Sequence, residues 1–467
     1  MDDTRTPMDI TLPASNEQSE LPEPKATKRS KPQVLSGFRD FLPAQMRVRQ
    51  RVTGLLRETF ERFGYEPLDT PTLEAYEVLR GKIGQDEKLL YHFTDLGGRE
   101  VGMRYDLTIP LARVVAMHAN DLVLPFKRYH MGPVWRADRP QKGRFREFWQ
   151  CDADIVGTRS TIADAEGVAV YNAVLSGLGF TQYEVRVNHR AVLRALAPYA
   201  GLPDSAAVPI IRAIDKLDKI GPEGVKAEMA ERGIAADAAD RVLDLITVTG
   251  STDEVMTHLR ARLADNADAI AGLADLARLF EYAAAFGVPD GRAVFVPALA
   301  RGLDYYTGPV YETYVPEGGV GSLGGGGRYD NLIGALGGRD LPATGISVGL
   351  ERILVVMEER GMAGVAASVT AALVAVLPGD DILPALQLTA ELRAAGIPAE
   401  VTLDPKRKLL EQFAYAERKG IPLALIAGQD ERAAGVVDIR DLTTREQRQV
   451  PRAEIVAALR GEHTQEM

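Results

Sequence analysis

Strand-like segments follow one another between residues 91 and 190 with turns, rather than helices, between them, and this arrangement limits the fold. Consecutive strands that no helix separates pair as an antiparallel sheet rather than as a doubly wound parallel one. The sequence therefore predicts an α+β fold built on an antiparallel sheet. The segments are Tyr91–Asp95, Glu100–Arg104, Phe126–Arg136 and Glu147–Ile155, with a helix expected at 161–178.

An amphipathic helix is expected over residues 45–63, ahead of these strands. Its mainly apolar side chains recur at steps of three and four residues, and Gly64 stands where such a helix commonly ends. An extended segment that contains Pro67 and Pro71 follows.

Three later regions differ in rhythm, and 467 residues suffice for two or three domains. Residues 191–290 are rich in alanine and leucine, with charges at helical spacing, which predicts a helical insertion. Residues 291–362 return to strands and glycine turns and end in a helix. Residues 370–463 alternate strand and helix, which indicates a small α/β domain with a mainly parallel sheet.

Residues 1–35 are rich in Pro, Ser, Thr, Glu and Lys and poor in large apolar side chains. Such a segment cannot bury enough apolar surface to offset the entropy of ordering, so we expect a disordered tail. Its basic residues form either a solvated linker or an accessory RNA contact. They are Lys25, Lys28, Arg29 and Lys31.

Composition argues against several classes of protein. The formal net charge of −10 disfavours bulk nucleic-acid binding, although a local basic patch can still bind RNA. The single cysteine, Cys151, allows no intramolecular disulfide bond and fits a reducing compartment. No apolar run reaches the ~18 residues of a membrane span, and the N-terminus does not read as a secretory signal. We therefore expect a cytoplasmic protein with no membrane partner.

Segment 126–157 reads as a strand, a basic loop and a second strand. Guanidinium groups match phosphate and carboxylate oxygens, so the loop is either a charged, solvated turn or a phosphate clamp. Its basic residues are Arg136, Arg139, Lys142, Arg144 and Arg146, around Gly143.

The strand after this loop favours a binding site. Phe148 and Trp149 come first, and an aromatic face can stack on a nucleobase. Gln150, Asp152 and Asp154 then alternate through an apolar context, where a polar side chain is costly to bury unless it meets a partner.

A second candidate segment is LARGLDYYTGPVYE, residues 299–312. Arg301, Asp304, Tyr305 and Tyr306 precede an alternating strand, either as a cation and two phenols in a pocket or as a turn with a salt bridge.

Two glycine-rich segments follow. Residues 318–338 contain four consecutive glycines, which either turn the chain or let the backbone approach a ligand, and no P-loop motif is present. ATGISVGLERILVV, residues 343–356, runs from a strand into a helix that opens with Glu351 and Arg352. Alone, this segment is more typical of strand–helix packing than of a binding site.

The six histidines show no metal-ligand spacing, and Cys151 has no sequence-local histidine partner. A metal hydrolase and a cysteine nucleophile are therefore not expected. The histidines are His92, His118, His130, His189, His258 and His463.

Together, and in this order, these segments resemble the class II aminoacyl-tRNA synthetase motifs. The helix and strand ending at Pro71 resemble motif 1, WRADRPQKGRFREF resembles motif 2, and GISVGLER resembles motif 3. RGLDYYTG and GGGGRYDNL resemble the two signatures of histidyl-tRNA synthetases, and GFRDFLP at 37–43 resembles their N-terminal entry. The C-terminal unit resembles the anticodon-binding domain of the histidyl, prolyl, threonyl and glycyl enzymes.

The resemblance implies a fold and an activity. A catalytic domain with a six- or seven-stranded antiparallel sheet and flanking helices would comprise residues 36–190 and 291–362, interrupted by the helical insertion at 191–290. Residues 370–463 would bind the anticodon, and motif 1 would form a homodimer. The implied activity is the ligation of L-histidine to tRNA(His), with ATP and Mg²⁺, through a histidyl-adenylate.

The resemblance also implies site residues. The imidazole nitrogens would meet Asp154 and one of Tyr305 or Tyr306, while Arg136 and Arg301, the catalytic pair, would meet the carboxylate and the ATP α-phosphate. The α-amino group would be held by Asp106, Leu107, Thr108 and Gln150. ATP would be bound by Arg136, Asp138, Arg144, Phe148, which stacks on adenine, and Arg352.

Two positions depart from many bacterial members of this family. Those members carry RPEGT where this chain has RYDLT, and glutamate where it has Asp154. Asp106 and Asp154 match the variant more typical of eukaryotic and archaeal members. Each acid keeps its charge but is one methylene shorter.

The chemistry accounts for these residue types. The histidine carboxylate is already a nucleophile at neutral pH, so attack on the α-phosphate needs alignment and charge neutralisation rather than a general base. Polar partners for both imidazole nitrogens would reject apolar analogues, so no editing domain is expected.

Two alternatives remain at this stage. A regulatory paralogue of histidine biosynthesis would keep the fold without charging tRNA, but such paralogues generally lack the C-terminal domain. A sister synthetase for proline, threonine or glycine would lack RGLDYY.

Overall fold

The computed structural model describes residues 31–81, 84–300, 305–316, 319–362 and 364–463. Most of the expected N-terminal tail lies outside these ranges. Among the described helices, none combines the length and the apolar composition that crossing a bilayer needs.

Within the described residues the main sheet has eight strands. Its six inner strands are antiparallel to one another, as expected. A short parallel strand at each edge, β1 beside β5 and β8 beside β7, extends it beyond the expected six or seven. Strands of two and three residues are too short to give a sequence pattern. The order is β1 (Glu66–Pro67), β5 (Phe126–Trp135), β6 (Glu147–Val156), β11 (Ala343–Gly349), β10 (Gly324–Arg328), β9 (Pro309–Tyr314), β7 (Glu184–His189) and β8 (Ala293–Phe295).

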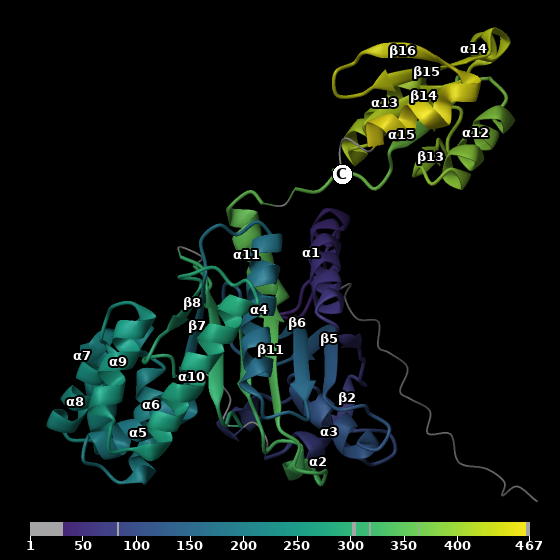
Figure 1. The fold of residues 1–467 in the computed structure, drawn as a ribbon. Helices are drawn as coiled ribbons and strands as arrows, with labels where there is room; N and C mark the ends of the chain where they lie inside the picture. Colours follow the sequence, from purple (N-terminus) through teal and green to yellow (C-terminus); the bar gives the residue numbers. More distant parts are fainter. Residues whose placement is uncertain (1–30, 82–83, 301–304, 317–318, 363, 464–467) are drawn as a thin grey trace, which may run out of the picture.

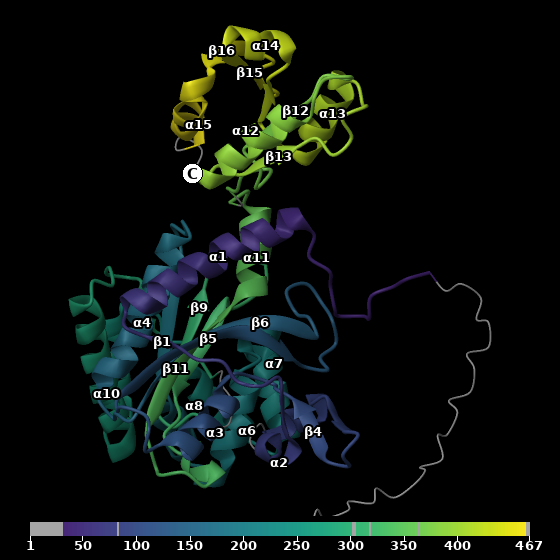
Figure 2. The same ribbon diagram turned by 90° about the vertical axis from the view of Figure 1, so that its right-hand side faces the viewer.

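Three helices pack beside this sheet: α1 (Pro43–Arg62), α4 (Thr161–Gly177) and α11 (Leu350–Glu359). Helix α4 lies against β6, β7, β9 and β11, α11 lies against β6, and α1 contacts both helices (Figures 1 and 2). The amphipathic pattern of α1 is explained by burial of Val52, Leu56 and Phe60, and Gly64, with a φ of +77°, follows its C-terminus.

The chain between β7 and β8 is helical, as predicted (teal in Figure 1). Helix α10 packs against α4 and α5, and the apolar side chains of these helices join the same hydrophobic core as the main sheet. The helices are α5 (Arg190–Tyr199), α6 (Ala207–Ile214), α7 (Leu217–Glu231), α8 (Ala236–Ile246), α9 (Thr252–Arg262) and α10 (Ala267–Ala285).

A small antiparallel sheet stands beside the main one. Helix α2 (Tyr76–Leu79) packs against this small sheet, and α3 (Thr108–His118) follows it in the chain. Its strands are β2 (Leu73–Ala75), β4 (Glu100–Met103) and β3 (His92–Thr94). Helix α3 begins directly after Asp106 and Leu107. The Leu107 carbonyl accepts a hydrogen bond from Arg128 of β5, so the start of the helix lies near the main sheet.

The C-terminal part is an α/β unit with hydrophobic clusters of its own. Strand β12 (Ala372–Ala375) is parallel to β13 (Ala399–Val401) and β14 (Leu423–Ile426), whereas β15 (Val436–Asp441) and β16 (Gln447–Pro451) form an antiparallel hairpin. Strand β15 is also antiparallel to β14, so the sheet is more mixed than expected. Its helices are α12 (Leu383–Ala394), α13 (Leu409–Lys419), α14 (Gln429–Ala434) and α15 (Ile455–His463).

The close packing of β10 against β11 gives a first prediction. A Cβ atom on Gly326 would overlap the Gly345 carbonyl oxygen of β11. Gly326→Ala should therefore lower the free energy of unfolding by about 3 kcal/mol, because the two backbones must move apart. Urea unfolding followed by circular dichroism measures this loss.

Gly325→Ala is the matched control. A Cβ atom there meets only the Tyr311 carbonyl oxygen, at an ordinary 3.4 Å. Its free energy of unfolding should stay within about 1 kcal/mol of the wild type. Equal losses in both variants would show that close approach of the strands is not the reason for glycine at 326.

Candidate active site

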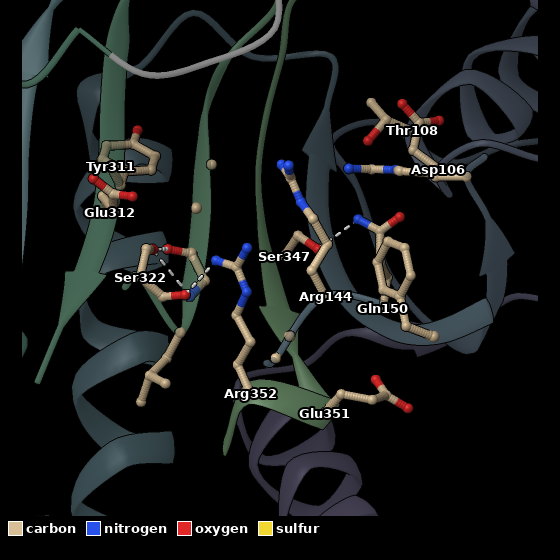
Figure 3. Close-up of a pocket in the computed structure, with 18 of the residues that line it drawn as sticks. Asp106, Thr108, Arg144, Gln150, Tyr311, Glu312, Ser322, Ser347, Glu351 and Arg352 are labelled. Atoms are coloured by element: carbon tan, nitrogen blue, oxygen red, sulfur yellow. Dashed lines mark hydrogen bonds between the residues drawn. The ribbon is translucent and has the colours of Figure 1, made fainter. Parts of the chain in front are cut away.

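A cavity of about 320 Å³ lies against the main sheet, between the β5–β6 hairpin and the start of α11 (Figure 3). Ten of the residues expected at the site line it: Asp106, Thr108, Arg136, Asp138, Arg144, Phe148, Gln150, Tyr305, Tyr306 and Arg352. The sequence analysis assigned no role to several other lining residues, among them Tyr311, Glu312, Ser322, Ser347 and Glu351.

The basic loop between β5 and β6 is fixed by its own backbone. Its ends are joined by a hydrogen bond from the Arg136 amide to the Arg146 carbonyl, and Gly143 turns the chain with a φ of +70°. Arg136 and Arg144 line the cavity. Lys142 instead pairs with an acid of α11, and Arg146 donates to backbone carbonyls. The loop thus presents selected guanidinium groups rather than a uniformly basic surface.

Two acceptor oxygens in the cavity wall have no hydrogen-bond donor within the described residues. The Asp106 carboxyl group is buried and accepts from the Ile109 amide through one oxygen, and its other oxygen has no partner within the described residues. The Gln150 amide donates to the Ser347 hydroxyl at 2.8 Å, which leaves its own oxygen likewise unpartnered in the described part of the chain. Burial raises the pKa of Asp106, and nearby Arg136 opposes this. A cationic ligand with several N–H groups would satisfy both oxygens.

Two phenols form an aromatic wall. The Tyr305 and Tyr306 rings lie 5.0 Å apart, edge to face, and the Tyr305 ring also meets Tyr329 at 5.9 Å. Burial raises the pKa of both Tyr305 and Tyr306, so both are neutral hydroxyl groups at physiological pH. Neutral phenols can donate and accept hydrogen bonds to a polar ring.

The other end of the cavity is aromatic and cationic. The Arg136 guanidinium lies 4.1 Å from the Tyr105 ring centre and 5.1 Å from that of Phe148. Arg352, on the first turn of α11, donates to the Ser322 carbonyl at 2.6 Å. A flat apolar group and an anionic chain would both fit this end.

Two expected residues, Asp154 and Leu107, sit behind the cavity wall. Arg301 lies outside the described residues. The Asp154 carboxylate lies 2.8 Å from the buried Arg128 guanidinium and accepts from the Tyr329 hydroxyl, while the Leu107 carbonyl accepts from Arg128. Neighbouring side chains therefore already engage this acid, and its expected contact with the ligand stays a prediction.

Comparison with known proteins agrees with this geometry. The sequence profile described as Histidyl-tRNA synthetase matches residues 37–353, and that described as Anticodon binding domain matches residues 373–462. A protein named Histidine--tRNA ligase from Rhodopirellula baltica is 44% identical over 90% of this chain and 95% of its own length. The chain belongs to the histidyl-tRNA synthetase family.

Solved structures agree in fold. The crystal structure of histidyl-tRNA synthetase from Nostoc sp. matches 93% of this chain and all of its own, with a TM-score of 0.83 and 32% identity. A structure described as an ATP phosphoribosyltransferase regulatory subunit/histidyl-tRNA synthetase from Bacillus halodurans matches 85% of this chain and 99% of its own, with a TM-score of 0.72. At 23% identity, this second likeness concerns the fold alone.

A buried acid joins the three segments that resemble the class II motifs. Glu351, at the start of α11, accepts from Arg49 of α1 and from the Trp149 amide of β6, both at 2.9 Å. Its side chain is 4% exposed. The sequence analysis missed this role, because 302 and 202 residues separate the partners and only the acid's place at a helix start was visible.

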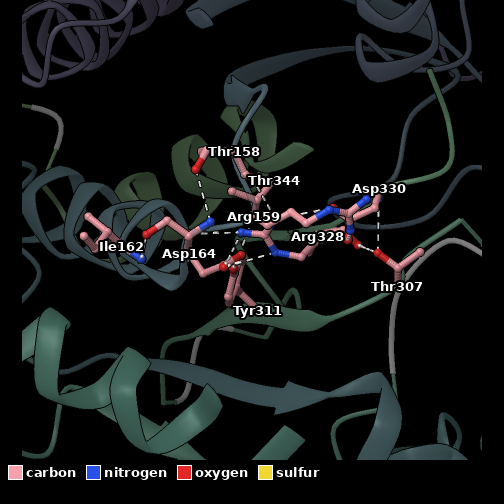
Figure 4. Close-up of polar contacts among 10 residues, drawn as sticks. Thr158, Arg159, Ile162, Asp164, Thr307, Tyr311, Arg328, Asp330 and Thr344 are labelled. Atoms are coloured by element: carbon pink, nitrogen blue, oxygen red, sulfur yellow. Dashed lines mark hydrogen bonds and ion pairs between the residues drawn. The ribbon is translucent and has the colours of Figure 1, made fainter. Parts of the chain in front are cut away.

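A second polar network supports Tyr311 (Figure 4). The Tyr311 hydroxyl donates to the buried Asp164 carboxylate of α4, which also pairs with Arg328 at the end of β10. Arg328 and Asp330 both bind Thr307, which closely follows the tyrosine pair. The signature GGGGRYDN thus positions the segment after RGLDYY, a link that sequence spacing could not reveal.

No resident metal site is found in the part of the chain that the structure describes. Within it, no group of three or more His, Cys, Asp or Glu side chains could hold a metal ion.

The Glu351 junction gives a second prediction. Glu351→Gln keeps an acceptor for the Trp149 amide but leaves the buried Arg49 guanidinium without a counter-charge. The free energy of unfolding should fall by about 3 kcal/mol, as measured in urea. Glu358→Gln, an exposed position on the same helix, should change it by less than about 0.5 kcal/mol. A Glu351→Gln variant as stable as the wild type would contradict the structural importance of this ion pair.

Proposed function

We propose that this chain ligates L-histidine to tRNA(His) by way of a histidyl-adenylate formed from ATP. The observation that carries this proposal is the cavity. In it converge arginines, neutral phenols and acceptor oxygens that have no partner in the part of the chain that the structure describes. Relatives named Histidine--tRNA ligase from Rhodopirellula baltica and Danio rerio support the amino acid and the reaction.

The histidine α-ammonium group would bind Asp106, Thr108 and Gln150. The Asp106 and Gln150 oxygens that have no partner within the described residues suit an N–H donor. The histidine imidazole would face Tyr305 and Tyr306. Asp154 would act on the imidazole from behind this wall, since Arg128 and Tyr329 hold it there. Leu107 would contribute through its backbone.

ATP would occupy the aromatic and cationic end. Adenine would stack on Phe148, and Arg144 and Arg352 would contact the triphosphate, with Asp138 beside them. Arg136, together with Arg301, would bind the histidine carboxylate and the α-phosphate. Guanidinium groups keep their charge at every relevant pH, so they stabilise the charge that develops on the phosphate without proton transfer.

Mg²⁺ would arrive with the triphosphate, because that ion usually takes one or two carboxylates and otherwise binds phosphate oxygens and water. Glu312, on the cavity wall, is a carboxylate of the type that would hold it. The ion would neutralise charge on the departing pyrophosphate.

The second step needs the 3′ end of tRNA, whose ribose hydroxyl attacks the adenylate. The match of residues 373–462 to an anticodon-binding domain supports binding at the far end of the same tRNA. The resemblance of α1 to motif 1 supports a homodimer, and exposed Leu35 and Leu42 near that helix suit such an interface. A relative named cytoplasmic supports that location.

Exchange of pyrophosphate into ATP tests the proposal. Exchange should depend on histidine and not on proline, threonine or glycine, and purified tRNA(His) should become charged. Activity with another amino acid but not histidine would contradict the proposal. Histidine-dependent exchange without charging would instead favour the regulatory paralogue.

A third prediction concerns Arg301. Arg301→Ala should slow histidine-dependent exchange by orders of magnitude, because lost stabilisation of this kind costs about 3–4 kcal/mol. The fold and the dimer should persist, as judged by circular dichroism and gel filtration. Arg159→Ala, which removes an exposed guanidinium paired with Asp330, should exchange normally. A near-normal rate in Arg301→Ala would refute the assigned role.

A further inference from the structure

A chain of polar groups lies behind Gln150, across the pairing of β6 with β11. Asp152 and Ser347 are direct partners in that pairing. The Gln150 amide donates to the Ser347 oxygen at 2.8 Å, and the Ser347 side chain is hydrogen-bonded to Asp152. Asp152 is 1% exposed and lies behind the cavity wall. Asp152 therefore reaches the cavity only through other residues.

We propose that Asp152 is a positioning residue that, through Ser347, holds the Gln150 amide with its oxygen turned toward the substrate's α-ammonium group. The inference rests on the proposed function, since it assumes that Gln150 meets this ammonium group.

The proposal follows from counting donors and acceptors. A hydroxyl group has one hydrogen to donate and two lone pairs to accept with, whereas a carboxylate only accepts. When Ser347 donates its hydrogen to Asp152, as its effect on the Asp152 pKa indicates, its lone pairs can take only an N–H from Gln150. This leaves the Gln150 oxygen without a partner within the described residues, on a side chain that lines the cavity.

Without Asp152 the Gln150 side-chain amide could flip, which exchanges the positions of its oxygen and its NH2 group. The Ser347 hydrogen would then be free to donate to the Gln150 oxygen, and the amide N–H groups would face the cavity. An N–H group that faces an ammonium group repels it, so the flipped amide would bind the substrate poorly.

Asp152 offers Ser347 an acceptor oxygen in both of its protonation states. Burial raises its pKa to about 8 and Arg128 opposes this, while Asp106 and Asp154 nearby raise it further. His130, its partner on β5, has its pKa lowered to about 3 by burial and is neutral. The carboxylic acid form also keeps a carbonyl oxygen, so Ser347 can donate to Asp152 in either form.

The test uses full-length protein and histidine-dependent pyrophosphate exchange. Asp152→Ala should raise the KM for histidine about tenfold, the size of one lost hydrogen bond to a charged group, and change the KM for ATP less than twofold. Asp152→Asn retains an acceptor oxygen and should restore most of the histidine affinity. An Asn variant as poor as the Ala variant would overturn the proposal in favour of a simple charge effect.

A ligand without an ammonium group separates positioning from general damage. The inhibition constant of 3-(imidazol-4-yl)propionate, which is histidine without its amino group, should be the same for wild type and Asp152→Ala. An equal loss for this inhibitor and for histidine would overturn the proposal.

Ser347→Ala provides a second, independent variant. It should reproduce the histidine KM of Asp152→Ala. The histidine KM of the double variant should not exceed that of the poorer single variant, because each substitution breaks the same contact from Asp152 through Ser347 to Gln150. Additive losses would overturn the proposal.

Asp438→Ala is the matched control, since Asp438 is a buried strand acid with one unpartnered oxygen in the C-terminal sheet. Its exchange constants should equal those of the wild type. Histidine-dependent exchange by the wild type tests the proposed function separately. The positioning role of Asp152 can therefore be refuted while that function stands.

Discussion

The pairing of β6 with β11 is the contact on which the cavity depends. Strand β6 carries Gln150, Asp152 and Asp154 at alternate positions, so all three face the same side of the sheet. Strand β11 brings Ser347 beside them although 197 residues separate it from Gln150. Buried polar side chains are costly unless each meets a partner, and this pairing supplies the first of those partners.

Small residues on β10 and β11 make room for the buried acids. A side chain at Gly345 would overlap the Asp154 carboxyl group, and one at Gly326 would overlap the backbone of β11. The glycine run therefore has two consequences at once. It lets three strands approach closely, and it leaves a shallow floor where Gly324, Gly325 and Gly326 line the cavity.

Local patterns predicted the parts of the structure that depend on neighbours in sequence. The turn of the basic loop at Gly143 and the amphipathic face of α1 depend on adjacent residues, and both could be read directly. The alternation of Gln150, Asp152 and Asp154 likewise indicated a polar strand face, but not that Asp154 would be engaged by Arg128 instead of facing the cavity.

Partners that are distant in sequence could not be predicted. Ser347 is one small residue in a strand of small residues, and nothing local distinguishes it. Glu351 and Asp164 likewise acquire their roles from Arg49 and Arg328, which meet them only after the helices pack on the sheet. The motif resemblance supplied residue roles, whereas the supporting contacts required the fold.

The charge pattern of the site explains why the proposed reaction needs no titrating base. Burial keeps Tyr305 and Tyr306 neutral and lowers the pKa of His189 to about 4, so neither the phenols nor the buried histidines change charge near neutral pH. The arginines do not titrate either. At the cavity wall, burial raises the pKa of the Asp106 carboxyl group above its usual range. An ammonium group bound beside it favours the carboxylate form, so substrate binding and ionisation of Asp106 reinforce each other.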